Sequence, residues 1–172
     1  MRFTGLSRAI PIVALSFSLD ASAEPLKVGD WWLTVQVDSS LVETFTSNGS
    51  NSTFGLICGA SCTFYLDTNT QCNEGEAIPM LVNSQSGSTY TIAKCEILTR
   101  GSITRYVSSF PDKDIVTAIS AGSVIGFAIP LVNGEFKVVR FSLNGAAAAT
   151  EKAADFAEKI RQDRGQYRDT IL

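Results

Sequence analysis

The sequence has no histidine among its 172 residues. Catalytic triads, zinc-metalloprotease helices and carbonic-anhydrase-like sites all need an imidazole, so these classes are excluded. The chain also lacks a Gly-x-Ser-x-Gly or Ser-x-x-Lys segment, and its 13 glycines never fall in a Gly-x-Gly-x-x-Gly or Walker arrangement. We therefore expect a protein that is not an enzyme and binds no cofactor.

Positive charge is also scarce. The chain has 14 lysines and arginines against 17 aspartates and glutamates, a net charge of −3, and its basic residues form no run. Proteins that bind nucleic acid or anionic membrane surfaces carry basic patches. We therefore expect no nucleic-acid partner.

Long hydrophobic runs are limited to one segment near the N-terminus, Ala9 to Leu19. Two arginines precede it and Ala21-Ser22-Ala23 follows, which is the arrangement of a secretory signal peptide. The run is too short for a spanning helix, and no later segment approaches the roughly 20 apolar residues that a bilayer requires. We expect residues 1–23 to be a signal peptide, the mature chain to have no membrane span, and the protein to be periplasmic or secreted in a bacterium.

Cysteine occurs four times, at Cys58, Cys62, Cys72 and Cys95. An even number in an exported chain is typical of structural disulfides, whereas zinc knuckles and thioredoxin-like centres need Cys-x-x-Cys, so we expect no metal. Three pairings are open. Cys58 can bond to Cys62 across a hairpin, which leaves Cys72 for Cys95. We favour links that close longer loops, because a longer loop gains more stability, about 3 kcal/mol at this size.

Short β-rich runs separated by turn residues occupy the chain from Asp30 to Leu143. Apolar residues alternate in "WWLTVQV", as in a half-buried strand, and the Asn-Gly pairs at 48–49 and 133–134 predict hairpin turns. The helical pattern occurs only in Phe110–Gly122 and after Leu143. The second helix carries a narrow apolar stripe made of Ala146, Ala149, Ala153, Phe156 and Ile160.

These patterns predict a mainly β fold: an antiparallel β-sandwich with one short helix and a C-terminal helix, stapled by disulfides. We expect a single domain over residues 24–165, with a flexible tail over 166–172.

Acidic residues gather around Cys72 in "DTNTQCNEGE". Asp67, Glu74 and Glu76 leave a carboxylate-based hydrolase open, because such an enzyme needs only geometry, but we rank it lowest. Asp67, Asn69 and Gln71 alternate as in the start of an EF-hand loop, yet the glycine and glutamate that this loop needs are missing. A polar loop beside a disulfide explains these residues best.

The segment "NSQSGSTY", Asn83 to Tyr90, resembles the Ser-Gly-x-x-Tyr segment of small periplasmic inhibitors of C-type lysozyme. In that family such a loop enters the lysozyme cleft. The resemblance makes Ser86, Gly87, Ser88 and Tyr90 a candidate binding loop; the alternative is a plain turn between two strands.

A longer stretch resembles the invasion-associated protein B family of exported bacterial proteins. The elements are "IVTAISAG", "VIGFAIPL" and "VVRFSLNGAAAA" in the C-terminal third, together with "GDWW" at residues 29–32. The chain departs from the family in lacking a cysteine soon after the opening tryptophan and an aromatic residue at Ala146. This distant resemblance implies an exported, β-sandwich-like domain with disulfides and a role in host-cell entry or the envelope. It implies no catalytic residues.

Taken together, the sequence predicts an exported, non-catalytic protein that acts by binding another protein, and the family resemblance implies an association with host interaction or virulence. The alternative is a periplasmic inhibitor of lysozyme that acts through the loop from Ser86 to Tyr90.

Overall fold

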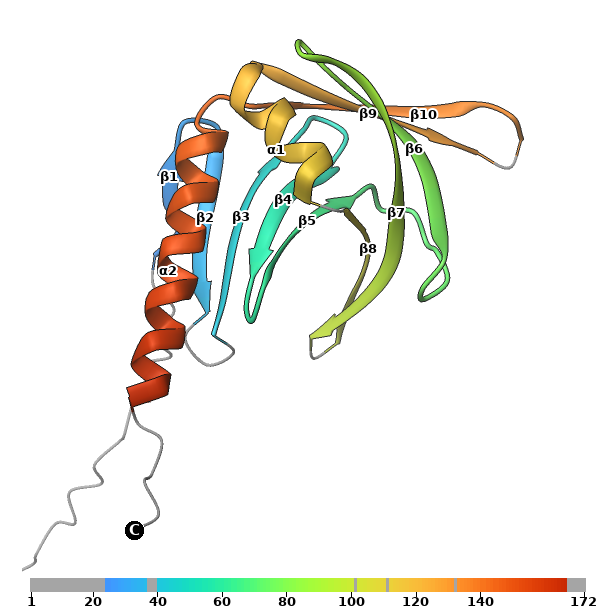
Figure 1. The fold of residues 1–172 in the computed structure, drawn as a ribbon. Helices are drawn as coiled ribbons and strands as arrows, with labels where there is room; N and C mark the ends of the chain where they lie inside the picture. The colour runs from blue at the N-terminus through green and yellow to red at the C-terminus, as the bar shows by residue number, and fades with distance from the viewer. Residues whose placement is uncertain (1–23, 37–39, 101, 111, 132, 167–172) are drawn as a thin grey trace, which may run out of the picture.

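The computed structural model describes residues 24–36, 40–100, 102–110, 112–131 and 133–166 (Figure 1). The expected signal peptide, residues 1–23, lies outside the described residues, as does the expected tail apart from Gln166. The strands are β1 (Leu26–Val28), β2 (Trp31–Gln36), β3 (Leu41–Ser47), β4 (Thr53–Cys58), β5 (Cys62–Asp67), β6 (Ala77–Ser84), β7 (Gly87–Arg100), β8 (Ile103–Phe110), β9 (Val124–Pro130) and β10 (Phe136–Ser142). The helices are α1 (Asp112–Ala121) and α2 (Ala146–Gln166). No described helix is both long and apolar enough to cross a membrane.

The described strands pair antiparallel in one sheet, in the order β1-β2-β3-β4-β5-β8-β7-β6-β9-β10. Two pairings between strands that are not consecutive, β5 with β8 and β6 with β9, make the sheet continuous. Because strands twist, so long a sheet curls, and its two halves come to face each other (Figure 1). The predicted mainly β fold with a short helix and a C-terminal helix is confirmed; both layers of the expected sandwich belong to a single sheet.

Aromatic side chains fill the space between the two halves. The ring of Phe54 on β4 lies 5.1 Å from Phe127 on β9 and 5.8 Å from Phe141 on β10. Trp31 on β2 meets the same Phe54 edge-on at 5.6 Å. Each of these residues lies on the inward-facing side of its strand and is buried, as the alternation in the sequence predicts.

Helix α2 packs on β1–β4 with a stripe of small residues. The buried members of the stripe are Ala146, Ala149, Ala153 and Ala157. Phe156, which the sequence pattern placed in the stripe, is instead 39% exposed. The prediction was wrong at this position because a step of four residues, from Ala153 to Ala157, follows the helix repeat of 3.6 more closely over this turn.

The start of β2 and the end of β10 are joined in a feature that we call the terminal clasp, residues 29–31 and 142–145. The Asp30 amide donates to the Asn144 carbonyl at 3.0 Å, and the Trp31 indole Nε1 donates to the Ser142 carbonyl at 3.0 Å. The Ser142 hydroxyl donates to the Asp30 carboxylate at 2.6 Å. Two of the segments that carried the family resemblance, "GDWW" and the "SLNG" within "VVRFSLNGAAAA", therefore contact each other and serve the fold.

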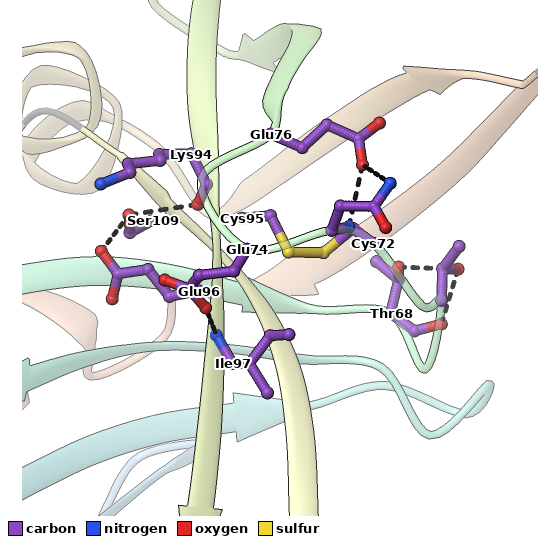
Figure 2. Close-up of a disulfide and its surroundings, with 11 residues drawn as sticks. Thr68, Cys72, Glu74, Glu76, Lys94, Cys95, Glu96, Ile97 and Ser109 are labelled. Atoms are coloured by element: carbon purple, nitrogen blue, oxygen red, sulfur yellow. Dashed lines mark hydrogen bonds between the residues drawn. A yellow bond between two sulfur atoms is a disulfide. The ribbon is translucent and has the colours of Figure 1, made fainter.

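The cysteines form two disulfides, Cys58–Cys62 and Cys72–Cys95, so the preference for longer links was wrong. Cys58 and Cys62 lie directly opposite each other in the β4–β5 hairpin, with Cα atoms 4.0 Å apart. The hairpin register brings these two sulfurs together, and this proximity outweighs the extra stability that a disulfide closing a longer loop would give. Figure 2 shows the second disulfide, which holds the loop after β5 against β7.

Candidate functional site

The outer side of β6, β7, β9 and β10 presents large apolar side chains to solvent. Strand registers place Tyr90, Leu81, Ala128 and Val138 side by side across the four strands. Ile92 on β7 and Phe136 on β10 extend this row along their strands. We call these residues the outer apolar face; its exposed fractions are Tyr90 59%, Ile92 53%, Leu81 45%, Val138 50% and Phe136 59%.

The same strands bury their alternate residues. Met80 and Val82 on β6 and Ile125 and Phe127 on β9 point inward and are at most 1% exposed. Period-two alternation normally puts polar residues on the solvent side of an antiparallel sheet. Here the solvent side is apolar as well, so ordinary sheet patterning does not account for it.

A groove of about 440 Å³ runs over β9 on this side. Gly126 and Ala128 form its floor, while Leu81 on β6 and Val138 on β10 stand beside it. A Cβ at Gly126 would meet Arg140 Cγ at 3.6 Å, an ordinary contact, so the position has room for a small side chain beside the stem of Arg140. The groove therefore follows from small residues on β9 between larger ones on both neighbouring strands.

One end of the groove is polar. Arg140 on β10 lies opposite Gly126, which in turn lies opposite Asn83 on β6. Gln85 in the β6–β7 turn donates from Nε2 to the Ser123 hydroxyl at 3.1 Å and accepts from the Ser123 amide at 3.2 Å. These two bonds fix the turn against the segment that precedes β9.

The candidate loop from the sequence lies at this polar end. Ser84 pairs with Gly87, so Gln85 and Ser86 form a two-residue turn, and the hydroxyls of Ser84 and Ser86 are 2.7 Å apart. Ser88 lines the groove, and Tyr90 belongs to the outer apolar face. The loop thus forms the tip of the β6–β7 hairpin and is continuous with the groove.

The contributions of β9 and β10 to this surface were not predicted from the sequence. In "VIGFAIP" the residues Gly126 and Ala128 alternate with large apolar ones, which is the signal for an outward groove floor. The alternation alone could not show which strands flank β9, because β6 is far from it in sequence.

A second feature is a charged cluster on β3, β5 and β8. The Tyr65 hydroxyl donates to Glu43 Oε1 at 2.5 Å, and Arg105 donates to Asp67 at 3.0 Å and to Glu43 at 3.3 Å. The Tyr65 ring is only 2% exposed and lies against Gly55, where a Cβ would come within 2.9 Å of it. Burial raises the pKa of the Tyr65 phenol well above its ordinary value, and the Glu43 carboxylate raises it further.

In this cluster the guanidinium of Arg105 pairs with both carboxylates, Glu43 and Asp67. Burial alone would lower the pKa of the Arg105 guanidinium, but Tyr65, Asp67 and Glu43 together raise it. The other Asp67 oxygen accepts the Asn69 amide at 2.9 Å. This arrangement fits a structural network better than an acid or base held ready for a substrate.

The acidic residues near the second disulfide have structural contacts as well. Glu74 accepts the Ile97 amide at 2.6 Å, and Glu76 accepts the Asn73 amide at 2.9 Å (Figure 2). The Glu74 bond holds the loop around Cys72 onto β7, and the Glu76 bond closes a turn within the loop itself. The polar-loop interpretation of "DTNTQCNEGE" agrees with this geometry.

The fold of this chain resembles that of a protein of known structure. The crystal structure of invasion associated protein B from Bartonella henselae is similar, with a TM-score of 0.56 and 12% identity over 79% of this chain and 99% of that chain. No family model matches the chain, and no curated protein matches its sequence. The likeness shows a distant relationship in fold with that protein.

Proposed function

We propose that this chain is an exported, non-catalytic bacterial protein that binds another protein through the outer apolar face. The observation that carries the proposal is the row Tyr90, Leu81, Ala128 and Val138, whose three large members are each at least 45% exposed. Contiguous exposed apolar surface marks sites of protein association, and aromatic residues are enriched there.

The location outside the cytosol is supported by two disulfides, which persist in oxidising compartments. The shared fold with a Bartonella protein named for invasion supports a partner on the bacterial envelope or on a host cell.

Site-specific photo-crosslinking tests the proposal. A photoreactive residue at position 90 or 138 should give the same adduct in cells, whereas one at Lys152, exposed on α2, should not. The purified partner should then bind the wild-type chain, and Tyr90→Ala should weaken the dissociation constant by about tenfold, as for a central aromatic contact. Adducts from position 152 alone, or equal affinity of Tyr90→Ala, would overturn the proposal.

A second candidate function, inhibition of lysozyme, is favoured by the exposure of Ser88 and Tyr90 on the same side of β7. The purified chain should slow the lysis of cell walls by lysozyme, and Tyr90→Ala should abolish this while Lys152→Ala should not. Absence of inhibition by the wild-type chain would remove this candidate.

A further inference from the structure

The groove over β9 has a definite charge character. Its lining combines an apolar floor and walls with Arg140 and the neutral polar residues Asn83, Gln85 and Ser88. None of the described residues that line it is acidic. A ligand in this groove therefore meets apolar surface beside one positive charge.

Arg140 differs from the other arginines whose side chains are described. Arg105 pairs with Glu43 and Asp67, and Arg161 pairs with Glu158. No carboxylate of the described residues lies within ion-pair distance of Arg140. Apart from its strand pairing with β9, its carbonyl accepts a hydrogen bond from Asn48 Nδ2 at 3.3 Å. Its guanidinium is thus available to an anion from outside, and its planar fork suits a carboxylate.

The shape of the groove limits what can occupy it. β6 and β10 are the neighbours of β9, and strands in a sheet lie about 4.8 Å apart, so the backbones of β6 and β10 are separated by roughly 10 Å, and the side chains of Leu81 and Val138 narrow the space between them. That width admits a single extended chain along β9, with one apolar side chain over Gly126 and Ala128. It is too narrow for a helix, whose diameter with side chains is about 10 to 12 Å.

We infer that the groove binds an extended acidic segment of the partner protein, with an apolar side chain on the Gly126–Ala128 floor and a neighbouring carboxylate on Arg140. This inference rests on the proposed function and names the chemistry of the partner. Asn83 and Ser88 supply further hydrogen-bonding groups along the same segment. A second copy of this chain is disfavoured as the occupant. In a symmetric dimer the two grooves would face each other, and neither groove lining offers a carboxylate to the Arg140 of the other copy.

The test uses a random 12-residue peptide library panned against the full, disulfide-bonded chain. Selected peptides should carry Asp or Glu beside Leu, Ile or Phe, and fluorescence anisotropy should show binding that weakens as salt concentration rises. Arg140→Gln and Gly126→Val should each weaken binding at least tenfold, whereas the matched surface change Lys152→Gln should leave it unchanged. Arg140→Lys, which keeps the charge but loses the fork, should fall between Arg140→Gln and the wild-type chain.

Other outcomes separate this inference from the proposed function. Peptides without acidic residues whose binding is sensitive to Gly126→Val but not to Arg140→Gln would overturn the inference and leave a protein-binding face in place. Failure to select any peptide, a dimer in sedimentation that Arg140→Gln dissociates, or Arg140-dependent binding to anionic phospholipid vesicles would also overturn it. The crosslinks from positions 90 and 138 report on the proposed function independently. Circular dichroism shows whether Gly126→Val is folded. If that variant does not fold, the peptide affinity of Arg140→Gln, a change at an exposed residue, tests the inference by itself.

Discussion

Substitution of Gly145 by alanine tests whether the terminal clasp stabilises the fold. Gly145 has a φ of 86°, and a Cβ there would collide with the Val28 carbonyl and lie 3.0 Å from the Cα of Gly29. The left-handed backbone alone costs an alanine about 1 to 2 kcal/mol. Relief of the collision must separate β1 from residue 145 and strain the two hydrogen bonds that the Asp30 amide and the Trp31 indole donate across the clasp, each worth about 1 kcal/mol. We expect Gly145→Ala to lower the free energy of unfolding by about 3 to 4 kcal/mol.

Gly134 provides the matched control. Its φ is 83°, almost the same as that of Gly145, but a Cβ there would have nothing within 4 Å. Gly134→Ala should therefore lose only the backbone term of about 1 to 2 kcal/mol. Urea unfolding of both variants, followed by tryptophan fluorescence, measures the difference, because Trp31 is buried in the clasp. Equal losses in the two variants would refute the reasoning, since the close approach of the backbones would then carry no energy.

Two further predictions concern the charged cluster and the disulfides. The pKa of Tyr65 is raised in the folded chain, so its stabilising contribution is complete below the unfolded pKa of about 10 and is lost as pH rises beyond that value. Tyr65→Phe should therefore flatten the fall in the free energy of unfolding above about pH 10. An alkaline slope equal to that of the wild-type chain would contradict this. Peptide mapping without reduction should recover the pairs Cys58–Cys62 and Cys72–Cys95, and recovery of any other pair would contradict the structure. Replacing the second pair by alanine should destabilise by about 3 kcal/mol and replacing the first by about 2, because the loops closed differ in length.

Local patterns in the sequence were enough to predict most of the strands and both helices. Alternation predicted β2 and its neighbours, and the Asn133-Gly134 pair predicted the β9–β10 hairpin. The three-residue β1 was missed, because so short a strand has no period to detect and is held by β2 and the clasp.

The candidate site was predicted only in part. Ser88 and Tyr90 were named from a short motif, and both lie on the surface that the structure identifies. Gly126 and Arg140 were not predicted as site residues, because their proximity to Asn83 depends on the pairing of β6 with β9, two segments distant in sequence.

What the sequence by itself determined is whatever depends on the nearest few residues: strand and helix periods, hairpin turns and the absence of an imidazole. The tertiary structure decided everything that depends on register between distant strands. It selected Cys58–Cys62 over longer links, joined the two halves of the sandwich into one sheet, and gathered Tyr65, Glu43 and Arg105 into one network. It also placed small residues of β9 between larger ones of β6 and β10. The physical reason is that a strand shows which of its faces is buried, but only pairing with its neighbours decides what that face and the opposite one will contact.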